Sequence, residues 1–173
     1  MDDKLKDIFS NINDWLKYAE GKSATLIAGN GALIFGMSRI YLSNDIDACL
    51  ASYLMFCSLL CLFSLSICLL SVVPALEMPW DSKPNEKHSN DNVLYFGDIA
   101  KYSPLEFLKK LSSKLGNRNE EFTEYQRDLA FQIITNSVIA NKKYNHFKIA
   151  IWLTLAAVTS PIVAVLIYFF RSK

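Results

Sequence analysis

Apolar side chains recur every three or four positions over residues 1–22, which places them on one face of a predicted helix. An amphipathic helix of this kind lies either on a bilayer surface or against a partner helix. The polar face mixes both charge signs, whereas surface-bound helices are usually rich in lysine and arginine, so we favour a partner helix. The apolar stripe consists of Leu5, Ile8, Phe9, Ile12, Trp15, Leu16 and Ala19.

Two long runs without a charged residue follow. One begins after Asp47 and has 29 residues, and the other begins after Lys148 and has 22. About 20 apolar residues in a helix cross the roughly 30 Å of bilayer hydrocarbon. We therefore predict transmembrane helices over residues 51–74 and 149–170, and expect an integral membrane protein.

A weaker apolar segment covers residues 23–42. It contains Asn30 and, near its end, Arg39, whose long side chain can reach the bilayer interface. Small residues at every fourth position favour close helix packing in a membrane. We interpret the segment as a further span; a buried soluble helix or a half-inserted helix is the alternative, so two to three transmembrane helices are predicted. The small residues are Ala24, Ala28, Ala32 and Gly36.

The polar region over residues 77–148 has helical periodicity and no strand-like alternation. Its first part, 77–92, is rich in proline, serine, asparagine and charge, and is typical of a flexible linker. Ser103, Pro104 and Glu106 together predict a helix start. A longer helix is predicted over 119–147 and onward into the last span. The predicted fold class is all-α.

The distribution of lysine and arginine predicts the orientation, because cytoplasmic segments carry an excess of both. Residues 77–148 hold eleven of them, residues 1–22 hold four, and the connection 43–49 holds none. We therefore place the N-terminus and residues 77–148 in the cytoplasm.

The overall composition argues against several function classes. With 18 basic and 17 acidic residues, the chain lacks the strong positive charge of a nucleic-acid-binding protein. Its four cysteines and two histidines show neither metal-ligand spacing nor a nucleophile with a base and an acid. We expect no catalytic residue, no metal site and no cofactor, and hence no enzyme.

Four groups of residues together resemble one family of bacterial membrane effectors. They are Trp15-Leu16-x-x-Ala19-Glu20-x-Lys22-x-Ala24-x-Leu26 followed by Asn30-Gly31-Ala32, Leu94-Tyr95-Phe96-Gly97-Asp98-Ile99-Ala100, Tyr102-Ser103-Pro104, and Asp128-Leu129-Ala130-x-Gln132-Ile133 with Asn136-Ser137. Over most of its length the chain is similar to the transmembrane effectors of Pycsar, the pyrimidine-cyclase antiphage system. The Tyr-Phe-Gly-Asp segment is the most specific part of the resemblance.

The resemblance implies a partnership between two proteins. A cognate cyclase makes cyclic UMP or cyclic CMP on infection, and the effector then disrupts the bacterial inner membrane, which causes abortive infection. Residues 77–148 become the signal-sensing region of a multi-pass membrane protein that is expected to form a homo-oligomer and to bind no nucleic acid.

No ligand-binding residues come with the resemblance, so the site is inferred from residue types. A cyclic mononucleotide needs a cation for its phosphate, an aromatic surface for its base and an amide for the base edge. An ionised carboxylate can accept the ribose hydroxyl. The alternative is that these polar residues only cap and solvate a helical bundle. The predicted ligand-binding residues are Tyr95, Asp98, Lys101, Tyr102, Arg127, Gln132 and Asn136.

A second function remains open, namely a constitutive membrane scaffold or small transporter subunit without a nucleotide ligand. A transporter is expected to carry polar or ionisable residues deep in its spans, where Asn30 is the clear candidate. A nucleotide-cyclase gene beside this one would favour the effector, and its absence would favour the scaffold.

Overall fold

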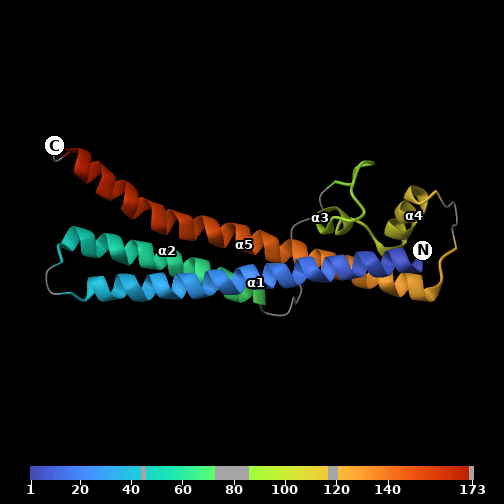
Figure 1. Ribbon diagram of the computed structural model, residues 1–173, viewed down its shortest axis with the longest axis horizontal. Helices are drawn as coiled ribbons and strands as arrows, with labels where there is room; N and C mark the ends of the chain where they lie inside the picture. Colours follow the sequence, from blue (N-terminus) through green and yellow to red (C-terminus); the bar gives the residue numbers. More distant parts are fainter. Residues whose placement is uncertain (44–45, 73–85, 117–120, 172–173) are drawn as a thin grey trace. The chain divides into compact units, whose positions relative to one another are not determined.

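The computed structural model describes residues 1–43, 46–72, 86–116 and 121–171, with side chains as far as Pro161. Within these ranges the chain forms helices and no strand, which confirms the predicted all-α class (Figure 1). The helices are α1 (Asp2–Tyr41), α2 (Ala48–Val72), α3 (Phe96–Ile99), α4 (Pro104–Lys114) and α5 (Glu124–Arg171).

The chain divides into two compact units. Unit 1 consists of residues 1–20 and 74–144, and unit 2 consists of residues 21–73 and 145–173. Both α1 and α5 supply residues to the two units without a break in the helix. The predicted N-terminal helix and the predicted first span are therefore successive parts of α1.

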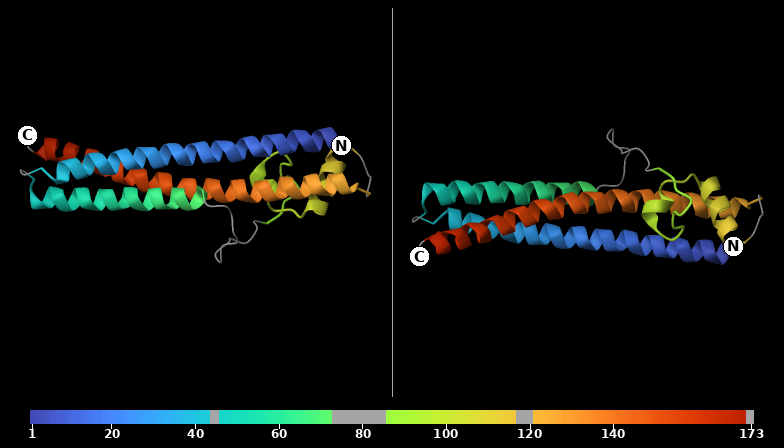
Figure 2. Two further views of the ribbon diagram at one scale, coloured as in Figure 1. Left: turned by 90° about the horizontal axis from the view of Figure 1, so that it is seen from below. Right: turned by 90° about the horizontal axis from the view of Figure 1, so that it is seen from above.

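The apolar stripe near the start of α1 packs against other helices of unit 1. Leu5, Ile8 and Ile12 are buried in one cluster with Phe107 of α4 and Ile133 of α5. Figure 2 shows this part of α1 running beside the first half of α5. The packing confirms the partner-helix interpretation of the stripe. The cluster also buries Phe96, Ile99, Leu108, Leu111, Phe122, Ala130 and Ala140.

Two helix starts in unit 1 carry reciprocal caps. At α4, the Glu106 N–H donates to Ser103 Oγ and the Ser103 N–H donates to the Glu106 carboxylate, so the helix begins where the sequence predicts. At α5, the Gln126 N–H donates to Thr123 Oγ1 and the Thr123 N–H donates to Gln126 Oε1. This second box makes α5 begin directly after Thr123. The predicted start at Asn119, which lies outside the described residues, was therefore too early.

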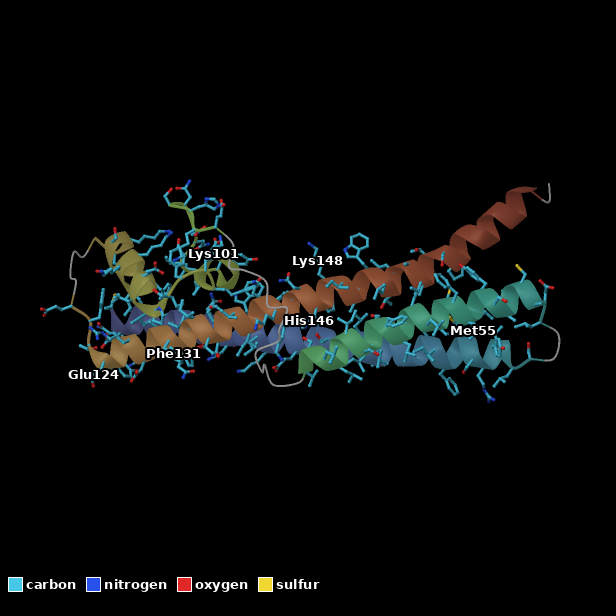
Figure 3. All side chains as sticks on the ribbon, turned by 180° about the vertical axis from the view of Figure 1, so that it is seen from behind. Met55, Lys101, Glu124, Phe131, His146 and Lys148 are labelled. Carbon is cyan, nitrogen blue, oxygen red and sulfur yellow. The ribbon has the colours of Figure 1, made fainter. Side chains whose placement is uncertain are left out.

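On α2 and α5 of unit 2, small and polar side chains lie inside and large apolar side chains lie outside. On α2, Cys61 and Ser64 are buried, whereas Met55 and Phe63 are exposed (Met55 is labelled in Figure 3). A water-soluble monomer rarely exposes so many large apolar side chains together, and small interior residues are typical of helices that pack in lipid. The division recurs on α5, where Ala150, Thr154 and Ala157 are buried and Ile149, Trp152 and Leu155 are exposed. On α1, the predicted packing stripe of Ala24, Ala28, Ala32 and Gly36 is exposed, so it does not mediate helix packing within unit 2.

A closed ring of hydrogen bonds joins α1, α2 and α5 within unit 2. Asn30 Nδ2 donates to Ser64 Oγ at 2.9 Å, and Thr154 Oγ1 donates to Asn30 Oδ1 at 2.9 Å. The single Ser64 proton has two acceptors within reach: Thr154 Oγ1 at 2.9 Å, which closes the ring, and the Ala150 carbonyl oxygen at 2.8 Å. All three side chains are buried. Because an unpaired amide in an apolar interior is costly, the ring specifies how the three helices align.

Among the helices that the structure describes, α2 alone is both long and apolar enough to cross a membrane by itself. It covers the predicted span 51–74 up to Val72, and residues 73 and 74 lie outside the described residues. The predicted spans 23–42 and 149–170 are parts of the longer α1 and α5. A total of two to three spans therefore stays a prediction.

We expect Ser64→Ala to destabilise unit 2 by about 0.6–1.7 kcal/mol, because it removes one member of the interhelical ring and leaves the Asn30 amide short of a partner. Unfolding of the purified protein by added SDS in mild detergent measures this loss. Ser66→Ala is the matched control, since the Ser66 hydroxyl is exposed and bonds within α2 to the Leu62 carbonyl oxygen. An equal loss in the two variants would contradict a stabilising role for the ring.

Candidate functional site

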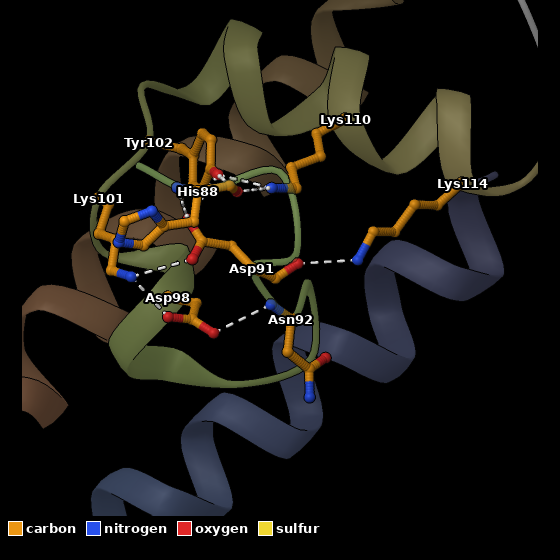
Figure 4. A network of polar contacts seen from close by, with 8 residues as sticks. All are labelled: His88, Asp91, Asn92, Asp98, Lys101, Tyr102, Lys110 and Lys114. Carbon is orange, nitrogen blue, oxygen red and sulfur yellow. Dashed lines mark hydrogen bonds and ion pairs between the residues drawn. The ribbon is translucent and has the colours of Figure 1, made fainter. Parts of the chain in front are cut away.

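A polar network centred on Asp91 joins the loop before α3 to α3 and α4 (Figure 4). Asp91 is 5% exposed, and its carboxylate accepts hydrogen bonds from the His88 N–H at 3.0 Å and the Tyr102 hydroxyl at 2.7 Å. Residues 86–92, part of the predicted flexible linker, are thus bonded to the rest of unit 1. The linker prediction was wrong for them, because a buried carboxylate fixes the loop; residues 77–85 lie outside the described residues.

Lys101 lies between two carboxylates of this network. Its Nζ donates to Asp91 Oδ1 at 3.1 Å and to Asp98 Oδ1 at 2.7 Å. Asp98 also accepts the Asn92 N–H at 2.9 Å. The positive charge of Lys101 is therefore already neutralised by the Asp91 and Asp98 carboxylates.

These contacts shift the pKa values of the groups that form the network. The pKa of Asp91 is lowered, first by the hydrogen bond from Tyr102 and next by a backbone N–H. Burial tends to raise the pKa of Asp98, but its bonds from Lys101 and a backbone N–H outweigh burial and lower it. The pKa of Lys101 is raised, mainly by its hydrogen bond to Asp98. Burial, followed by the hydrogen bond to Asp91, raises the pKa of Tyr102 to about 12. Both aspartates and Lys101 therefore stay ionised at neutral pH, while Tyr102 stays neutral.

Two lysines, one turn apart on α4, reach the same loop. Lys110 Nζ donates to the Tyr102 hydroxyl oxygen at 2.6 Å and to the His88 carbonyl oxygen at 2.9 Å. Lys114 Nζ donates to the Asp91 carbonyl oxygen at 2.8 Å. Among the described residues, neither lysine forms an ion pair with a carboxylate. Their positive charges therefore remain available to an anion.

The Tyr-Phe-Gly-Asp segment is held by aromatic packing. The Phe96 ring stacks on Tyr144 with centroids 5.0 Å apart and lies 5.7 Å from the Trp15 ring centroid. A Cβ atom on Gly97 would lie 2.7 Å from the Tyr95 ring, so glycine is the residue that lets this ring cover the backbone. In this motif, Phe96 packs into the core, Gly97 lets the Tyr95 ring lie against the backbone, and Asp98 supplies a carboxylate to the network.

The predicted ligand-binding residues fall into separate groups. Asp98, Lys101 and Tyr102 meet in the Asp91 network, and Tyr95 is exposed beside it over Gly97. On α5, Arg127 and Gln132 are exposed, and Asn136 Nδ2 donates to Asn13 Oδ1 at 2.8 Å. Within the described part of the chain, no hydrogen bond or ion pair joins these α5 residues to the network. The seven-residue site stays a prediction.

Three residues of the network escaped the sequence-based prediction. Lys110 and Lys114 carry a usable signal, since two lysines four apart on a predicted helix share a face. Asp91 carries none, because it stands among the prolines, serines and asparagines that made its surroundings resemble a linker.

We expect unit 1 to lose stability on acidification, because its buried or bonded carboxylates have lowered pKa values. The Lys87 ammonium, followed by the Ser103 N–H and hydroxyl, lowers the pKa of Glu106 from 4.5 to about 2, and Asp91 and Asp98 are shifted in the same direction. Such groups contribute fully above their unfolded pKa, and that contribution is lost as the pH falls through the folded pKa. The thermal midpoint, followed by near-ultraviolet circular dichroism, should fall between about pH 4.5 and pH 2.

Asp91→Asn tests the source of this pH dependence. The variant should have a lower midpoint at neutral pH, because Lys101 loses one of its two carboxylates, and a shallower fall on acidification. Glu121→Gln changes an exposed carboxylate of unit 1 and is the control. A pH profile of Asp91→Asn that coincides with that of Glu121→Gln would rule out the network as the source.

Comparison with known proteins identifies the family of the chain. The model of the Pycsar effector protein domain matches residues 4–170. The chain is also 25% identical over 145 residues to the Pycsar effector protein PtPycTM of Propioniciclava tarda, an alignment that covers 79% of this chain and 65% of that relative. No solved structure matches the chain. A match over almost the whole sequence shows that the chain belongs to the Pycsar effector family.

Proposed function

We propose that this protein is a membrane effector of a bacterial antiphage system, activated by cyclic UMP or cyclic CMP from a cognate cyclase. On activation it disrupts the inner membrane and causes abortive infection. Family membership carries the proposal. The relative PtPycTM is described as a Pycsar effector protein, and the chain spans about 65% of its length.

The construction of the two units supports this role. Unit 1 buries large apolar side chains and keeps its charges on ordered loops and helix faces, as expected of a module in water. Unit 2 buries small and polar side chains and exposes large apolar ones, as expected of helices in lipid. Because α1 and α5 are unbroken between them, a ligand that favours one packing of unit 1 acts on helices that also form unit 2.

A small transporter subunit has less support than an effector. Asn30, the polar residue expected to face a transport path, is fully buried, and both ends of its amide are bonded to Ser64 and Thr154. Its role in unit 2 is therefore structural. A constitutive scaffold is the second candidate, and it differs from the effector in having no response to a nucleotide.

We expect the protein to be harmless when expressed alone and to depolarise the inner membrane when a cyclic pyrimidine nucleotide appears. The experiment co-expresses it with a uridylate- or cytidylate-cyclase, or with a catalytically dead version of that cyclase. A membrane-potential dye follows both strains. Equal depolarisation with the active and the dead cyclase would exclude a signal-gated effector and leave a constitutive function.

The proposed orientation places residues 77–148 in the cytoplasm of a multi-pass protein, and a cysteine-labelling experiment tests it. Cys49 is exposed at the start of α2, beside the connection that the orientation places outside the cytoplasm, so an impermeant thiol reagent should label it in intact cells. Ser113 is exposed on α4. In the double variant Cys49→Ser, Ser113→Cys, labelling should require permeabilised cells. Strong labelling of this variant in intact cells would reverse the orientation.

A further inference from the structure

Unit 1 contains an open cleft of about 480 Å³ beside the Asp91 network. It lies between the first turns of α1, the segment before α3 and the C-terminal half of α4. Its volume falls within the range of about 300–1,000 Å³ that is usual for small-molecule sites. The lining residues are Lys4, Asp7, Ile8, Asn11, Val93, Leu94, Leu111, Lys114 and Leu115.

The walls of this cleft are mainly apolar and are fixed by the core of unit 1. Ile8 and Leu111 belong to the buried cluster, and Val93 packs against it. Leu94 and Leu115 are partly exposed at the cleft and offer apolar surface to a bound ligand. Asn11 Nδ2 donates to the Leu94 carbonyl oxygen at 3.2 Å, which ties α1 to the segment before α3. The cleft is therefore formed before any ligand arrives.

The polar lining gives the cleft a net charge of about +1. Lys4 and Lys114 contribute two positive charges, and Asp7 contributes one negative charge. Lys4 and Asp7 approach to 3.9 Å, but both are largely exposed, so this ion pair is weak. Lys114 is bonded to a backbone carbonyl oxygen, and its charge has no carboxylate partner among the described residues. The cleft therefore suits a small ligand with one negative charge.

We propose that this cleft binds the cyclic pyrimidine nucleotide, an assignment that rests on the proposed effector function. The ligand's single phosphate charge is met by Lys114 and Lys4. The apolar walls contact the faces of the ribose and pyrimidine rings. Asn11 uses its Nδ2 in the bond to Leu94 and retains Oδ1 to accept from the base edge, while Asp7 accepts from the ribose hydroxyl.

The cleft meets the needs of this ligand better than the residues predicted from the sequence. The phosphate would compete with two carboxylates at Lys101, which is already paired with Asp91 and Asp98. Lys114 has no such competitor within the described chain. On α5, Asn136 is already bonded to Asn13, and neither Arg127 nor Gln132 lines the cleft.

Binding of cyclic UMP and cyclic CMP to the purified full chain in lipid nanodiscs tests the assignment. Isothermal titration calorimetry should show that Lys114→Ala weakens binding tenfold or more, because a charge-assisted contact to the phosphate is lost. Leu115→Glu should weaken binding to a similar extent by placing a negative charge in the cleft. Lys109→Ala and Leu105→Glu are the matched controls, since both change exposed residues of α4 outside the cleft and should bind as wild type does.

The possible outcomes distinguish failure of the cleft as the binding site from failure of the proposed effector function. If the wild type binds a nucleotide and both cleft variants bind it equally tightly, the assignment of the binding site to the cleft is wrong and the effector role stands. Loss of binding in Arg127→Ala and Gln132→Ala, with the cleft variants unaffected, would also contradict the assignment and would place the binding site on α5. If the wild type binds neither nucleotide, the effector proposal fails and the cleft fails with it. Leu115→Glu leaves the Lys114 bond to the loop in place, so the test does not depend on Lys114→Ala folding correctly.

Discussion

The hydrogen-bonded ring around Asn30 is the constraint on which the construction of unit 2 depends. An amide in an apolar interior must be bonded on both its donor and its acceptor side, and here Ser64 and Thr154 supply the partners from two other helices. A shift of one helix along another would break the ring, so one alignment is selected. Small neighbours such as Cys61 and Ala157 then allow the close approach that the short bonds require.

The same two helices follow opposite packing rules along their length. In unit 1, α1 buries Leu5, Ile8 and Ile12, as a helix does in water. In unit 2 it buries Ser23 and Asn30 and exposes large apolar residues such as Phe35 and Ile40, as a helix does in lipid. This change helps to explain why residues 23–42 look like a weak span in the sequence: two of their polar residues, Ser23 and Asn30, are buried inside unit 2.

Patterns confined to one stretch of chain were predictable from the sequence, and arrangements assembled from distant stretches were not. The stripe on α1 and the helix start at Ser103 are each contained within one or a few turns, so periodicity and residue type reveal them. Lys4 and Lys114 stand 110 positions apart, and only the packing of α1 against α4 brings them to one cleft. Asp91 is buried by contacts that composition does not encode.

The energy of the Asn30 ring can be compared with what a ligand must supply to shift a packing equilibrium. Interhelical hydrogen bonds in lipid are worth about 0.6 kcal/mol on average and about 1.7 kcal/mol at most, so the three bonds of the ring amount to roughly 2–5 kcal/mol. Reversing a packing equilibrium from about 1:99 to 99:1 takes roughly 5.5 kcal/mol of differential affinity. A ligand that favoured another packing would offset a ring of this strength with a differential affinity of about thirtyfold to a few thousandfold.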